Sequence, residues 1–70
     1  MQTPDFAAVL DEIRALGEET RLRIVIILAR GELTVTELTH ILQQSQPRVS
    51  RHVRILADAG ILDKHREGAW

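Results

Sequence analysis

Hydrophobic residues recur at intervals of three and four along much of this chain, which is the spacing expected of amphipathic helices. The first such stretch follows Asp5, a good helix cap, and stops at Gly17, a residue type that commonly ends helices. Its apolar positions are Phe6, Val9, Leu10, Ile13 and Leu16. We therefore predict a first amphipathic helix between Asp5 and Gly17.

A second stretch, from about Glu19 to Arg30, is apolar on nearly all sides. Its β-branched residues would also suit a strand, but its length, its acidic start and the glycine at position 31 favour a helix. A helix that is apolar all round is normally surrounded by protein. We expect this helix to be the central and most buried one.

Residues 34–59 show the pattern of a helix, a short turn and a longer helix. The capping-box pattern of Thr34–Glu37 predicts a helix of about two turns. Two glutamines then lead to Ser45, a good cap, and to Pro47, which suits a first helical turn. The second helix ends at Gly60. This arrangement is the helix-turn-helix pattern.

The residues after this helix predict a β-hairpin. Residues 61–65 can be extended, Glu67 and Gly68 can form a turn, and residues 69–70 can begin a returning strand. The predicted fold is thus mainly α with a small β-hairpin, a winged helix-turn-helix in one domain over residues 1–70. Because a two-residue strand is too short to stand alone, we expect that the wing is truncated at the C-terminus of these seventy residues and that they are the start of a longer protein or a trimmed piece of one.

Charge is distributed unevenly, although the net charge is only −1. Residues 1–20 hold five acidic side chains against Arg14 alone, whereas residues 21–70 hold eight basic side chains against five acidic ones. Residues 45–54 contain three arginines and His52 and no acid. Any anion-binding surface is therefore expected in this segment.

Composition excludes several other classes of function. The chain has no cysteine, which removes disulfides and thiolate metal sites within these residues. Its longest strongly apolar run, residues 24–29, is far shorter than a membrane span, so we expect a cytoplasmic protein with no membrane partner. His40, His52 and His65 lie on three different predicted elements, so we expect no metal and no cofactor. No group of residues converges as a catalytic site would, so we expect no enzyme.

The second helix of the predicted helix-turn-helix carries the chemistry for recognising DNA. If Val49, Val53 and Leu56 pack inward, the arginines of this helix point outward. Glutamine, arginine and serine in the first turns suit base edges in the major groove, and later basic residues suit phosphates. The predicted partner is double-stranded DNA. The candidate DNA-binding residues are Gln46, Arg48, Ser50, Arg51, Arg54, Lys64 and Arg66.

Three segments resemble the ArsR-type (arsenic repressor-like) winged-helix transcriptional regulators. Residues 16–24 are similar to the start of that family's second helix, 46–53 to its recognition helix, and 59–62 with 66–70 to its wing. The resemblance implies a homodimeric repressor that binds a palindromic operator and releases it when a ligand or metal reaches the dimer. Dimers of the family use the first helix together with a C-terminal helix after the wing.

The chain departs from the family where soft metals bind. Members that sense arsenic have cysteines in the segment that holds Thr34 and Thr36 here, and hydroxyls do not replace thiolates for a soft metal. Two other interpretations stay open. One is a winged helix that uses its apolar first helix to dimerise or dock on another protein without touching DNA. The other is the N-terminal regulatory domain of a fusion with an S-adenosylmethionine-dependent methyltransferase.

Overall fold

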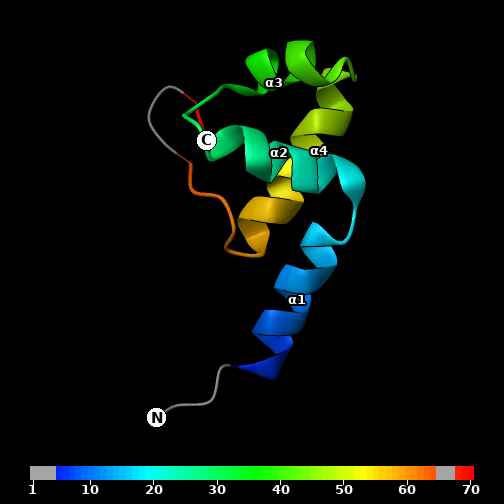
Figure 1. Ribbon diagram of the computed structural model, residues 1–70, viewed down its shortest axis with the longest axis vertical. Coiled ribbons are helices and arrows are strands. Elements are labelled where there is room, and N and C mark those ends of the chain that lie inside the picture. Colours follow the sequence, from blue (N-terminus) through cyan, green and yellow to red (C-terminus); the bar gives the residue numbers. More distant parts are fainter. Residues whose placement is uncertain (1–4, 65–67) are drawn as a thin grey trace.

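The computed structural model describes residues 5–64 and 68–70. Its helices are α1 (Phe6–Leu16), α2 (Glu19–Leu28), α3 (Val35–Leu42) and α4 (Gln46–Asp58). Figure 1 shows α2, α3 and α4 gathered together, with α1 extending away from them toward the N-terminus. The four predicted helices are thereby confirmed, and α2 ends two residues before the predicted Arg30.

Helix starts follow from capping side chains, three of which the sequence predicts, while the cap of α2 by Glu18 was not predicted. At each start a side-chain oxygen accepts a hydrogen bond from a backbone N–H of the first turn, which would otherwise lack a partner. The capping box is complete, since Glu37 Oε1 also accepts from the backbone N–H of Thr34 at 2.9 Å. The four capping residues are Asp5, Glu18, Thr34 and Ser45.

The core is centred on α4. This helix contacts each of the other three and supplies three of the six buried side chains in the described part of the chain. The expectation that α2 is the most buried helix is wrong. Ile24 is its only fully buried residue, and Ile26 is 57% exposed. The reason is geometric: α2 is apolar on more sides than its neighbours cover. The buried side chains are Ala15, Ile24, Leu38, Val49, Val53 and Leu56.

The predicted hairpin over residues 61–70 is not found among the described residues. Residues 61–64 form no strand, and Ala69 instead makes an antiparallel bridge to Thr34. Trp70 N–H donates to the Leu33 carbonyl at 3.0 Å, and Leu33 N–H donates to the Trp70 carbonyl at 3.4 Å. The extended segment before α3 offers these free backbone groups, so the end of the chain pairs with it. The predicted turn falls partly on residues 65–67, which lie outside the described residues.

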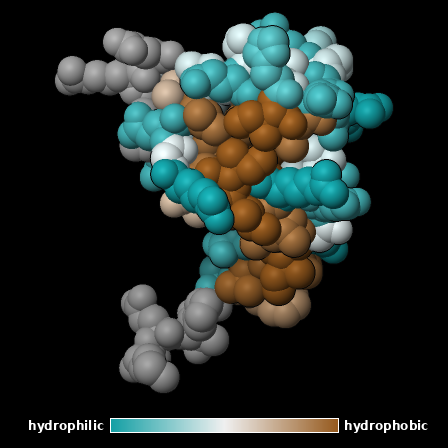
Figure 2. Space-filling view, turned by 45° about the horizontal axis from the view of Figure 1, so that its top comes forward, coloured by the Kyte–Doolittle hydropathy of each residue, from teal (hydrophilic) through white to brown (hydrophobic). Residues whose placement is uncertain are grey.

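One side of α1 is apolar and open. Phe6 is 78% exposed and Ile13 is 61% exposed, and Val9 lies between them at helical spacing. Figure 2 shows a hydrophobic band that includes α1 and continues over the middle of the molecule.

None of the described helices has the length and apolar character to cross a bilayer.

Candidate nucleic-acid interface

The turn between α3 and α4 sets the direction of α4. α3 ends at Leu42, and its C-cap Gln43 has a left-handed φ of 55°, which ends the helix and turns the chain toward the cap of α4 at Ser45. Ser45 then caps α4 by accepting from the Arg48 N–H at 3.4 Å, and Pro47 lies in the first turn. The cap leaves Gln46 exposed at the start of the helix. The first turn of α4 is therefore a fixed, solvent-facing end.

The two faces of α4 are as predicted. Val49, Val53 and Leu56 are fully buried. Three arginines, Arg48, Arg51 and Arg54, are exposed, and Ser50 is half-buried at the border. The hydrophobic stripe thus fixes the rotation of the helix and turns its basic residues toward solvent.

A hollow of about 670 Å³ lies between α4 and the segment that leads into the predicted wing. It brings together four of the predicted residues, Ser50, Arg51, Arg54 and Lys64. Lys64 follows the helix by six residues in the chain, yet it lines the same hollow as the arginines. The remaining lining residues are Val35, Pro47, Val53, Ala57, Asp58 and Trp70.

A second hollow, of about 420 Å³, lies on the side of α4 toward the start of α2. Arg48 and Arg51 line it, so Arg51 borders both hollows. Basic side chains of α4 therefore line hollows on two sides of the helix. The other lining residues are Glu18, Thr20, Arg21, Gln44, His52 and Ile55.

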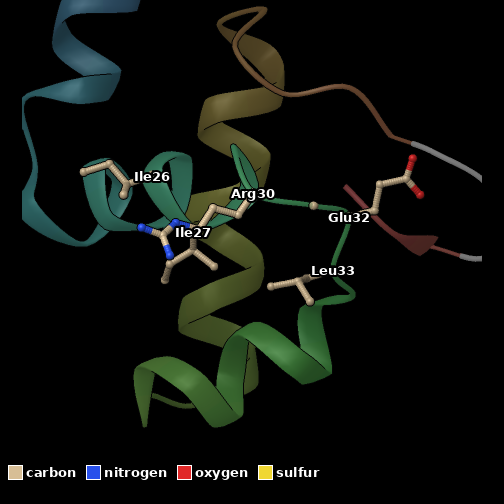
Figure 3. Close-up of a pocket in the computed structure, with 6 residues that line it drawn as sticks. Ile26, Ile27, Arg30, Glu32 and Leu33 are labelled. Carbon is tan, nitrogen blue, oxygen red and sulfur yellow. The ribbon is translucent and has the colours of Figure 1, made fainter.

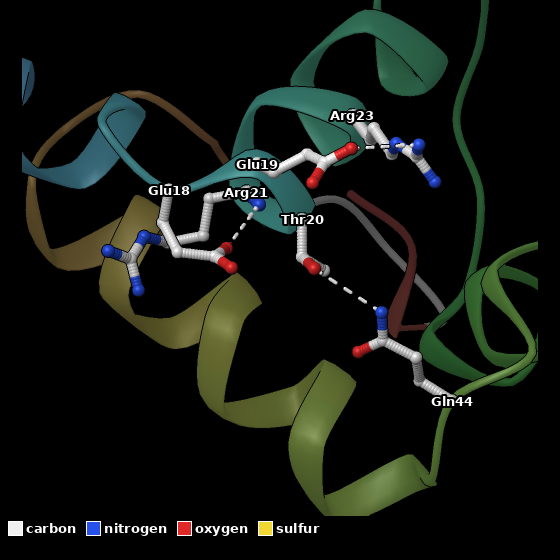
Figure 4. Close-up of polar contacts among 6 residues, drawn as sticks. All are labelled: Glu18, Glu19, Thr20, Arg21, Arg23 and Gln44. Atoms are coloured by element: carbon white, nitrogen blue, oxygen red, sulfur yellow. Dashed lines mark hydrogen bonds and ion pairs between the residues drawn. The ribbon is translucent and has the colours of Figure 1, made fainter.

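Polar contacts tie this second hollow to the rest of the fold (Figure 4). Gln44 Nε2 donates to Thr20 Oγ1 at 3.3 Å, which joins the turn to the start of α2. Glu18 Oε2 accepts from the Arg21 N–H at 3.0 Å and lies 3.9 Å from His52 Nδ1. The backbone hydrogen bond from Arg21 lowers the pKa of Glu18. Burial lowers the pKa of His52, and the nearby Glu18 partly opposes that shift.

Some site residues escaped the sequence prediction, and one predicted residue has no described position. Trp70 and Asp58 line the first hollow, and Glu18 and Gln44 line the second. Of these four residues, only Asp58 could have been found from the sequence, because it follows Arg54 by four residues and therefore lies on the same side of the helix. Arg66 lies outside the described residues.

A third hollow, of about 400 Å³, lies at the end of α2 and has a different character (Figure 3). Aliphatic side chains dominate it, with Arg30 beside Ile27, while Glu32 points away. Its described lining holds no nucleophile beside a base, so it offers no catalytic arrangement. The lining residues are Ile26, Ile27, Arg30, Gly31, Glu32 and Leu33.

Comparison with known proteins assigns the chain to a family. The family described as "Bacterial regulatory protein, arsR family" matches residues 18–64. The arsenic resistance transcriptional regulator ArsR1 of Pseudomonas putida is 50% identical over 58 residues, which are 81% of this chain and 45% of that protein. The arsenical resistance operon repressor of Escherichia coli is 41% identical over 66 residues, 93% of this chain and 56% of that protein.

A further relative, the arsenic resistance transcriptional regulator ArsR2 of Pseudomonas putida, is 43% identical over 61 residues, 86% of this chain and 53% of that protein. The chain spans about half the length of these relatives. The matched region, residues 18–64, contains the whole helix-turn-helix and the basic face of α4. The chain therefore belongs to the arsR family of bacterial regulatory proteins, and the matched region holds its helix-turn-helix.

Proposed function

We propose that this chain is the operator-binding part of a transcriptional repressor and that α4 enters the major groove. The observation that carries the proposal is the exposed basic face of α4, bordered by two hollows that share Arg51. Residues in the first turns, Gln46, Arg48, Ser50 and Arg51, would contact base edges. Phosphate contacts would come from Arg54, Lys64 and Arg66.

A salt series tests this proposal. Phosphate binding releases counterions, so the affinity for random-sequence duplex DNA should fall as salt is added. A plot of the logarithm of the affinity against the logarithm of the salt concentration should be linear, and its slope should be about −1 for each phosphate contacted. Fluorescence anisotropy measures the slope. The competing class, a winged helix that docks on another protein through α1, predicts an interaction that hardly responds to salt. No DNA binding at low salt would contradict the proposal.

We further propose that α1 forms part of a homodimer interface. The family resemblance implies an interface that is made by the first helix together with a C-terminal helix. The support is its apolar side, on which Phe6 and Ile13 are mostly exposed to solvent in the single chain. Covering such side chains is favourable by about 25 cal/mol for each Å² removed from water. A dimer would also place two copies of α4 on the half-sites of a palindrome.

Ile13→Glu should weaken self-association because a carboxylate would be buried without a partner in the interface. Sedimentation velocity over a range of concentrations measures the monomer–dimer equilibrium. Ile41→Glu is the matched control, since Ile41 is 54% exposed on α3 and lies outside the proposed interface. Equal weakening by both variants, or wild-type self-association that Ile13→Glu leaves unchanged, would rule out this role of α1.

The effector is proposed to act elsewhere than at a thiolate site in α3. The chain has no cysteine, and the Thr34 hydroxyl is occupied as the cap of α3, where it accepts from the Glu37 N–H at 3.2 Å. Hydroxyl oxygens are poor ligands for soft metals.

As a regulator of transcription the protein would act in the cytoplasm, where the bacterial chromosome lies.

A further inference from the structure

The start of α2 is a junction that connects three parts of the fold. Arg21 Nε donates to the Ala15 carbonyl of α1 at 2.7 Å. Thr20 accepts from Gln44 in the turn before α4, and the carboxylate of Glu18 faces His52 of α4 at 3.9 Å. The start of α2 therefore contacts α4 at two places: Gln44 in the turn before α4, and His52 in the middle of α4.

His52 sits at an unusual place in this junction. Its side chain is only 16% exposed, and its Nδ1 atom is buried without a hydrogen-bond partner in the described structure. It lines the second hollow together with Arg48, one helical turn earlier, and Arg51. Buried polar atoms without partners are rare in folded proteins, so the position of this Nδ1 atom calls for an explanation.

The charged groups around this hollow come from two elements. The start of α2 contributes Glu18 and Arg21, and α4 contributes Arg48 and Arg51. The turn contributes Gln44, which is neutral, and α1 contributes no described residue to the lining. Glu18 is thus the one anion in the described lining, and it is the group closest to Nδ1 with an opposite charge.

We propose that Glu18 and His52 are positioning residues that form a proton-dependent link between the start of α2 and the recognition helix, strengthening DNA binding when His52 is protonated. The inference rests on the proposed function, in which α4 reads DNA. A protonated Nδ1 becomes a donor that the Glu18 carboxylate, 3.9 Å away, can accept, which offsets part of the cost of burying the charge between α2 and α4. The added positive charge lies beside the two arginines that face DNA, where phosphates favour it.

Folding and DNA binding should respond to pH in opposite directions. Burial holds the pKa of His52 in the free protein below its ordinary value, so the unfolded chain takes up the proton first as the pH falls. The stability contributed by neutral His52 is present above the unfolded pKa and is lost as the pH falls toward the folded pKa. Bound DNA favours the protonated form instead. A purely structural histidine would weaken folding and DNA binding together.

The test measures DNA affinity and folding stability at about pH 7.5 and about pH 5.5, on either side of the ordinary histidine pKa. The probe is a random-sequence DNA duplex at constant salt. Wild-type affinity should rise on acidification, by up to about ten-fold for each unit by which DNA raises the pKa of His52. Over the same range the urea midpoint of the free protein should fall.

Three variants separate the contributions. His52→Gln should lose the rise in affinity. Glu18→Gln keeps an oxygen to cap α2 but removes the anion, so the pKa of His52, followed by NMR, should fall and the rise should move to lower pH. His40→Gln removes an exposed histidine of α3 and should behave as wild type.

Either of two results would overturn the link while the proposed function stands. One is a wild-type protein that binds DNA equally at both pH values. The other is a Glu18→Gln variant in which His52 titrates as in wild type. Loss of DNA binding at every pH and salt concentration would instead overturn the proposed function, and the link with it.

Discussion

Replacing Arg48 and Arg51 with alanine should lower the affinity for a cognate operator by about 1–3 kcal/mol for each guanidinium that grips a guanine. Both side chains are exposed on the first turns of α4, whose buried stripe fixes the direction in which they point. The operator would be obtained by selecting duplexes from a random pool with the wild-type protein. Affinities of the single and double variants are then compared on selected and random DNA.

A control for charge is available on another helix. Arg14→Ala removes one positive charge from α1, where Arg14 is exposed and lies outside the linings of both hollows beside the first turns of α4. This variant should bind the operator nearly as well as wild type. If Arg48→Ala and Arg51→Ala lose equal amounts on selected and random DNA, these arginines contact phosphates and the base readers must be sought elsewhere on α4.

Local chemistry made the helices and the basic face of α4 predictable. Each cap lies within three residues of the N–H groups that it satisfies, and the inward side of α4 follows from the spacing of Val49, Val53 and Leu56. Such patterns depend on neighbours along the chain, so the sequence contains them. The prediction that Arg48, Arg51 and Arg54 face solvent was confirmed for the same reason.

Contacts between distant parts of the chain were not predictable in this way. Trp70 pairs with Leu33 across 37 positions, and the predicted hairpin partner was the nearer segment at residues 61–65. Glu18 and His52 are 34 positions apart, and nothing in either neighbourhood indicates the other. The exposure of Ile26 likewise depends on how many helices surround α2, which its own sequence does not specify.

Leu38→Ala should destabilise the fold by about 2–5 kcal/mol, the range for removing a buried leucine from a packed core. Leu38 is fully buried on α3, and α3 packs against α4. A domain of this size has only a few kcal/mol of stability to lose, so the variant should be largely unfolded and should lose DNA binding with its fold. Urea unfolding followed by circular dichroism measures the change.

Ile41→Ala is the matched substitution on the same helix. Ile41 lies three residues after Leu38 but is 54% exposed, so its removal should change stability by no more than about 0.5 kcal/mol. Circular dichroism and DNA affinity should both stay near wild type. A large loss of stability in Ile41→Ala would mean that another surface covers this side chain in solution, because in the single chain it is exposed. The outer side of α3 would then be a contact surface, and Ile41 could no longer be placed outside the dimer interface.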